Sequence, residues 1–77
     1  MSNVTIEVIL DDIRAELERA QKNYPKMNSF HEGYAIILEE LDEVWDEIKM
    51  KNHNVQEIYR ELIQVGAMCV RCAYDNC

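Results

Sequence analysis

Residues 29–48 have the sequence SFHEGYAIILEELDEVWDEI, in which apolar residues recur at steps of three and four. This spacing predicts a helix with one apolar arc and an acidic remainder. The arc consists of Tyr34, Ile37, Leu38, Leu41, Val44, Trp45 and Ile48. Ser29 and Glu32 form a capping box, in which the Ser hydroxyl accepts from the Glu32 amide and the Glu side chain reaches back. The helix is expected to end at residues 49–51, where two lysines suit its C-terminus.

The flanking segments predict two more amphipathic helices. The first runs from about Val4 to Asn23, where Pro25 stops it, and its apolar positions are Ile6, Ile9, Leu10, Ile13, Leu17, Ala20 and Tyr24. Asn54 caps the third, which continues nearly to the end of the chain, with expected inward positions Val55, Ile58, Leu62, Val65, Cys69 and Ala73. The fold class is therefore all-α, as a three-helix up-down-up chain.

Length and composition support one domain over residues 1–77. The chain is 48% hydrophobic with 2 Gly and 1 Pro, which favours a few long helices over many strands. A monomer this small buries only about 60% of its surface on folding. We therefore expect a homo-oligomer, a dimer or tetramer, in which units placed side by side complete a bundle core.

The net charge of the chain limits the kinds of partner that it is expected to bind. Fifteen acidic and eight basic residues give a net charge of −7, which disfavours nucleic acids and anionic membranes. An anionic ligand such as a nucleotide would need a divalent cation to bridge it to the carboxylates. Residues 1–5 lack the features of a signal peptide and no stretch reaches the length of a membrane span, which predicts a cytoplasmic protein. The three cysteines, all in the last nine residues, are interpreted as thiols.

Glu40, Glu43 and Glu61 are the candidate metal ligands. Glu40 borders the apolar arc beside Val44, and Glu43, three residues on, can aim at the same point. Glu61 stands between Ile58 and Val65 and is expected to be half-buried. Carboxylates converging in apolar surroundings either take up protons or bind a cation, and oxygen ligands on helices suit Mg²⁺ or Mn²⁺.

Two simpler interpretations remain open. The acidic pattern by itself favours a solvated helix face that binds nothing. Cys69-Val70-Arg71-Cys72 has the spacing of a redox or zinc motif, but it lies late in a helix, away from the helix N-terminus that would stabilise a thiolate.

Residues 31–47 together with residues 60–68 resemble the second and third helices of small MazG-like nucleotide pyrophosphohydrolases, which phages often encode. The family signature is E-E-x-x-E followed by E-x-x-D, and the first half is present as Glu39-Glu40-Leu41-Asp42-Glu43. The second half differs, since Glu61-Leu62-Ile63-Gln64 carries an amide at the family's fourth, aspartate ligand. The resemblance implies a MazG-like bundle formed through oligomerisation, located in the host cytoplasm if phage-encoded.

The resemblance also implies a function and residue roles. Mg²⁺ held by Glu40, Glu43, Glu61 and Gln64 would serve cleavage of a nucleoside triphosphate between its α and β phosphates. Glu39 would orient the attacking water, as a base or as a residue behind the ligands. Lys26, His31 and Arg71 are candidate phosphate partners by charge, with ordinary solvated residues as the alternative. Because Gln64 is neutral, a nucleotide-binding protein without catalysis and a purely structural helical oligomer remain alternative functions.

Overall fold

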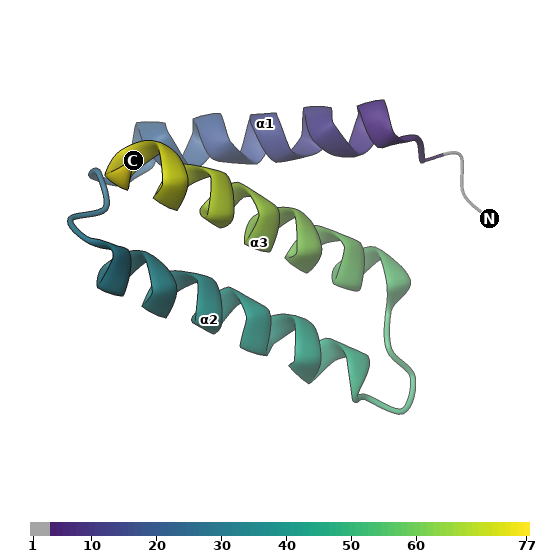
Figure 1. The fold of residues 1–77 in the computed structure, drawn as a ribbon. Coiled ribbons are helices and arrows are strands. Elements are labelled where there is room, and N and C mark those ends of the chain that lie inside the picture. Colours follow the sequence, from purple (N-terminus) through teal and green to yellow (C-terminus); the bar gives the residue numbers. More distant parts are fainter. Residues whose placement is uncertain (1–3) are drawn as a thin grey trace.

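Three helices make up the computed structural model, which describes residues 4–77 (Figure 1). Their bounds are Ile6–Asn23 for α1, Phe30–Ile48 for α2 and Val55–Asn76 for α3. No strand occurs within residues 4–77, which confirms the all-α class. Residues 1–3, part of the segment analysed for a signal peptide, lie outside the described residues.

Each helix begins at the cap that the sequence supplies. The Ser29 hydroxyl accepts from the Glu32 amide at 3.1 Å, and the Asn54 side chain accepts from the amides of Gln56 and Glu57. The Glu32 carboxylate reaches back to the Asn28 amide at 2.6 Å, one residue before the expected partner. The first helix begins at Ile6 and not near Val4, because the Thr5 hydroxyl caps it by accepting from Val8.

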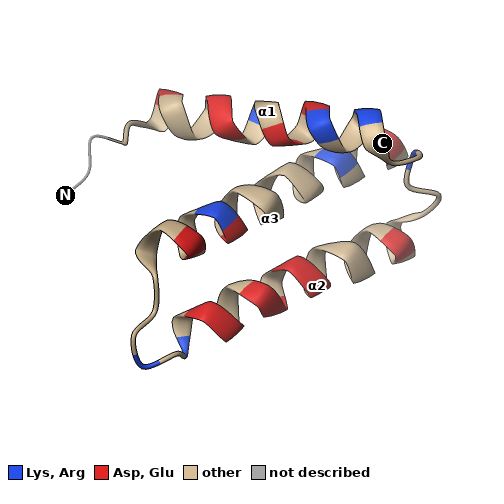
Figure 2. Ribbon diagram, turned by 180° about the vertical axis from the view of Figure 1, so that it is seen from behind, with Lys and Arg blue, Asp and Glu red and all other residues tan. Residues whose placement is uncertain are grey.

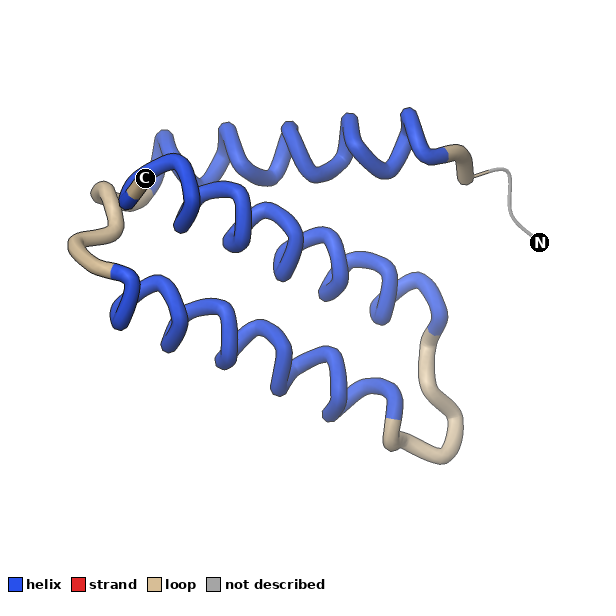
Figure 3. The backbone as a smooth tube through the Cα atoms, in the orientation of Figure 1, coloured by secondary structure: helices blue, strands red, loops and turns tan. Residues whose placement is uncertain are grey.

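The helices alternate in direction, and α3 lies between α1 and α2 (Figures 1 and 3). α3 packs against both neighbours, whereas the backbones of α1 and α2 do not approach each other. α1 comes close where α3 carries Gly66, since a Cβ at that position would lie 3.1 Å from Ile13 Cδ1. The Tyr59 hydroxyl also donates to Asp12, which ties α3 to α1. The predicted up-down-up order is therefore present.

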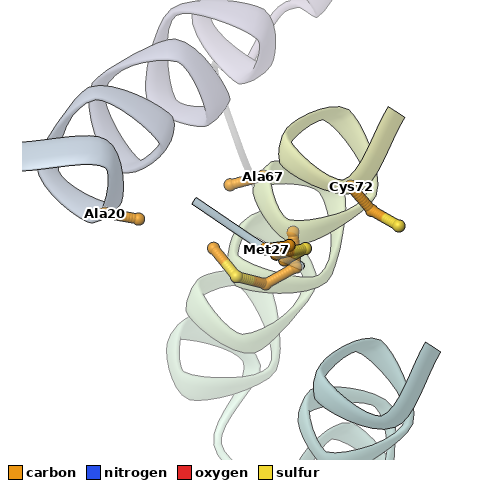
Figure 4. Packing of buried hydrophobic residues seen from close by; sticks show 5 residues of the cluster. Ala20, Met27, Ala67 and Cys72 are labelled. Atoms are coloured by element: carbon orange, nitrogen blue, oxygen red, sulfur yellow. The ribbon is translucent and has the colours of Figure 1, made fainter. Parts of the chain in front are cut away.

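The main cluster of buried core residues is small (Figure 4). It consists of Ala20, Met27, Ala67, Met68 and Cys72, with Ile13, Leu17, Ile36 and Ile37 packed against it. Gly33 lets α2 approach α3 closely, because a Cβ there would overlap the Cys72 sulfur at 2.2 Å. No larger residue fits at Gly33 without a shift of its neighbours.

The loop between α1 and α2 is fastened to α3. Met27 is almost fully buried, and its amide donates to Asp75 Oδ2 at 2.9 Å. Arg71 donates to the Pro25 carbonyl at 2.7 Å. These bonds give the backbone groups of Pro25 and Met27 partners on α3.

The expected inward face of the third helix is wrong. Val55, Leu62, Cys69 and Ala73 are exposed, and Ile58 and Val65 are half-buried. The buried positions are instead Ile63, Ala67, Met68, Arg71 and Cys72. Because α3 packs against α1 on one side and α2 on the other, its buried residues face two directions. The row with the most apolar residues faces neither neighbouring helix directly.

Within residues 4–77, no helix is long and apolar enough to cross a membrane.

Candidate metal centre

Three carboxylates from two helices meet at one point. Glu40 and Glu43 stand one turn apart on α2, and Glu61 reaches the same point from α3. One oxygen from each lies within 4.8 Å of the others. The residues that the sequence predicted as ligands are therefore brought together by the packing of α2 against α3. Acidic residues recur along the C-terminal half of α2, from Glu39 to Glu47 (Figure 2).

Two oxygen atoms of these carboxylates are buried without a partner. Glu40 Oε1 and Glu61 Oε1 are shielded from solvent, and neither has a hydrogen-bond partner among residues 4–77. A buried carboxylate oxygen without a donor is costly, and native structures hold few such atoms. The arrangement leaves these oxygens free to bind a cation or a proton.

Burial and like charge raise the pKa of both carboxyls. For Glu40 the larger cause is burial, followed by the charges of Glu43, Glu61 and Glu39. For Glu61, burial again comes first, and the neighbouring Glu43 adds to it. A divalent cation between the groups would reverse this effect, because it favours the ionised forms.

A pocket of about 360 Å³ adjoins the acidic cluster through Glu40, which lies in its wall, whereas Glu43 and Glu61 are not among its lining residues. It spans all three helices, with further lining residues Glu16, Arg19, Ala20, Tyr24, Pro25, Glu32, Ile36, Glu39, Gln64, Met68 and Arg71. The volume is in the range of small-molecule sites. The pocket thus joins the acidic cluster to two arginines and an aromatic ring.

The remaining predicted site residues lie at different distances from this centre. Glu39 and Gln64 line the pocket beside Glu40. Lys26 is exposed and lines a neighbouring hollow together with Arg71. His31 is exposed at the start of α2 and lines neither of these two hollows. The structure therefore places Glu39 and Gln64 in the wall of the pocket that also includes Glu40, and it leaves Lys26 and His31 outside that wall.

Arg71 has a structural role that its charge did not reveal. Its side chain is buried, with the guanidinium 5.9 Å from the centre of the Tyr24 ring and 3.9 Å from Asp75. Since it also donates to Pro25, it holds the loop to α3. The interpretation of Arg71 as an ordinary solvated residue is therefore wrong, because the loop between α1 and α2 folds over its side chain.

Arg19 and Tyr24 line the pocket although sequence analysis did not select them. Arg19 makes two hydrogen bonds to Glu16, at 3.0 and 2.6 Å, and its side chain is about half exposed. No sequence signal marks either residue, because their place in the wall depends on how α1 crosses α3.

The cysteine pair does not form a site with the described acids. Cys69 is exposed, whereas Cys72 is buried in the core against Gly33. All three cysteines are free thiols, as interpreted from their number and position.

Comparisons with protein-family models, with curated proteins and with solved structures found no match to this chain.

Proposed function

We propose that this chain is a Mg²⁺-dependent nucleoside triphosphate pyrophosphohydrolase, which yields a nucleoside monophosphate and pyrophosphate. The observation that carries the proposal is the meeting of Glu40, Glu43 and Glu61, with two buried oxygens that lack partners. Carboxylate oxygens on helices are the donors that Mg²⁺ and Mn²⁺ prefer. The resemblance to MazG-like proteins assigns the same three residues as ligands.

The residues around the cluster supply the other requirements of the reaction. Mg²⁺ bound there would neutralise phosphate charge and lower the pKa of a bound water. Glu39 lines the pocket beside Glu40, where its carboxylate can accept a proton from the attacking water. Arg19 offers a partly exposed cation for a phosphate, and the Tyr24 ring offers an apolar surface for a base.

A nucleotide-binding protein without catalysis is the second candidate, and Gln64 favours it. Gln64 lines the pocket where the family pattern has an acidic ligand, and its amide oxygen brings no negative charge. Three carboxylates hold a divalent ion less tightly than four. The pocket would then bind a nucleotide and release it unchanged.

Pyrophosphate release separates these candidates. A panel of ordinary and modified nucleoside triphosphates is incubated with Mg²⁺, Mn²⁺ or chelator, and nucleotide binding is measured in parallel. The enzyme hypothesis expects metal-dependent release that Glu40→Gln abolishes and Glu18→Gln, a change at an exposed residue of α1, leaves intact. Metal-dependent binding without release would identify the second candidate. If neither pyrophosphate release nor nucleotide binding is observed, both hypotheses are refuted.

A further inference from the structure

Two charged side chains near the end of α3 hold the segment that connects α1 to α2. Asp75 Oδ2 accepts from the Met27 amide at 2.9 Å, and Arg71 donates to the Pro25 carbonyl at 2.7 Å. The two side chains lie 3.9 Å apart and are only 7% and 8% exposed, so each compensates the buried charge of the other. We call Arg71 and Asp75 the loop clamp.

The loop clamp also restrains an aromatic ring. The guanidinium carbon of Arg71 lies 5.9 Å from the centre of the Tyr24 ring, within the range of a cation–π contact. Tyr24 follows the last residue of α1 in an extended conformation and is more than half exposed. Exposed side chains in connecting segments ordinarily change rotamer within nanoseconds. Contact with a buried guanidinium therefore fixes a ring that would otherwise move.

The clamped segment forms part of the wall of the pocket beside the acidic cluster. Tyr24, Pro25 and Arg71 line this pocket, and all three also line the neighbouring hollow. Because open space borders the segment in both hollows, its position depends on the loop clamp. Tyr24 is the one aromatic residue among the described residues that line the pocket.

We infer that Arg71 and Asp75 are positioning residues, which hold Tyr24 where its ring stacks on the base of a nucleotide bound in the pocket. The inference rests on the proposed function. Mg²⁺ at the acidic cluster would bind the phosphates, which leaves the nucleoside to the rest of the wall, where Tyr24 supplies the ring. A ring that is already fixed loses less freedom when the ligand binds, so the loop clamp raises affinity through Tyr24.

Kinetics with two ligands test the inference. Arg71→Lys keeps the charge but removes the planar group beside Tyr24. We expect its KM for a nucleoside triphosphate to rise about tenfold, as for the loss of one base–aromatic stack, with kcat changed by less than about twofold. Inorganic tripolyphosphate has no base, so its inhibition constant should stay at the wild-type value. An equal loss for both ligands, or no loss for either, would overturn the inference.

A double variant shows whether Arg71 acts through Tyr24. Tyr24→Leu removes the ring and should raise KM about as much as Arg71→Lys, whereas Tyr24→Phe keeps the ring and should retain most of the affinity. Combining Tyr24→Leu with Arg71→Lys should cause no further loss, because the ring that Arg71 positions is already absent. Additive losses would contradict positioning through Tyr24.

Asp75 gives an independent test, since it does not line the pocket. Asp75→Ala removes the acceptor of the Met27 amide, so hydrogen exchange at Met27 should become faster and KM should rise. Asp75→Asn keeps an oxygen for this amide and should recover most of the loss, with Glu18→Gln as the control. If Arg71→Lys loses its helical circular dichroism, the Asp75 variants decide, and an unchanged KM in Asp75→Ala overturns the inference.

Failure of the inference can be told from failure of the proposed function. If the wild type binds nucleotide without pyrophosphate release, the dissociation constant replaces KM in each comparison. A wild type that neither binds nor hydrolyses nucleotide refutes the proposed function and the inference with it. A functional wild type whose Arg71 and Asp75 variants are unaffected overturns the inference alone.

Discussion

At the scale of single residues, Glu61 is the side chain on which the metal hypothesis depends most. It is the contribution of α3 to the cluster, and its buried oxygen has no partner among the described residues. Its ionised form is opposed by burial and by Glu43. Without a cation, Glu61 therefore lowers the stability of the fold, and with one it links α2 to α3.

Glu61→Gln should consequently raise the thermal stability of the metal-free chain and remove the stabilisation that bound Mg²⁺ gives. The amide has the same shape, carries no charge and can donate to Glu43. We expect the Tm without metal to rise by a few degrees, since about 1 kcal/mol corresponds to roughly 4–8 °C in a domain of this size. Thermal unfolding with Mg²⁺ and with chelator measures both effects. Equal Mg²⁺ stabilisation in the wild type and the variant would argue against Glu61 as a ligand, and Glu18→Gln is the control.

A substitution at Gln64 should strengthen the binding of Mg²⁺. Gln64→Asp restores the acidic residue of the MazG-like pattern in the pocket wall beside Glu40. An added carboxylate should tighten Mg²⁺ binding about tenfold, because a further negative oxygen strengthens binding of a hard cation. Calorimetric titration with Mg²⁺ measures this, with the neutral Gln64→Asn as a control of equal length. If both variants bind Mg²⁺ equally, residue 64 does not take part in the metal site.

At the scale of helices, the α2–α3 contact is closest where Gly33 meets Cys72. A Cβ at Gly33 would lie 2.2 Å from the Cys72 sulfur and 3.3 Å from Met27 Sδ, so Gly33→Ala forces the core apart. We expect a loss of about 1–3 kcal/mol from overpacking, against at most about 1 kcal/mol gained in helix propensity. Chemical denaturation measures the balance.

The double variant Gly33→Ala, Cys72→Ala should recover stability relative to Gly33→Ala, because it removes the overlapping sulfur. Gly66→Ala is the comparison, since its Cβ would meet only the end of the flexible Ile13 side chain, at 3.1 Å. A Gly33→Ala protein as stable as the wild type would show that the two helices are less closely packed than described.

The helices themselves could be predicted because their signals are local. Ser29 and Asn54 predicted where α2 and α3 start, and Pro25 lies just beyond the end of α1, whereas the Thr5 cap that starts α1 at Ile6 was not predicted. The convergence of Glu40, Glu43 and Glu61 was also predicted, with the family resemblance adding to the helical spacing. The buried face of α3 could not be predicted from hydrophobicity, because the row that contains Val55, Leu62 and Val65 is more apolar than the row that contains Ala67 and Arg71. The pocket wall from α1 depends on packing between distant segments, which no local pattern encodes.

At the scale of the whole molecule, the raised pKa values of Glu40 and Glu61 make stability depend on pH. Both groups hold protons more tightly in the folded chain than at their ordinary pKa of 4.5. The folded state then binds more protons than the unfolded state, so their contribution to stability falls as pH rises from about 4.5 through the raised pKa values. Bound Mg²⁺ favours the ionised forms, and its stabilising effect should therefore grow over the same range.

Urea unfolding over a series of pH values measures this dependence. The double variant Glu40→Gln, Glu61→Gln removes both titrating groups, so the difference between wild type and variant isolates them from the other carboxylates. Without metal, we expect the wild type to lose stability relative to the variant as pH rises. A difference that does not change with pH would contradict the described burial of these carboxyls.

Titration of the wild-type chain with Mn²⁺, followed by the electron paramagnetic resonance signal of the ion, tests whether Glu40, Glu43 and Glu61 together bind a divalent cation. We expect one Mn²⁺ site per chain, from which Mg²⁺ displaces the Mn²⁺, and we expect this site to be lost when all three residues are changed to glutamine. Absence of binding, or equal binding by the triple variant, would contradict this expectation and leave the acids as a solvated face.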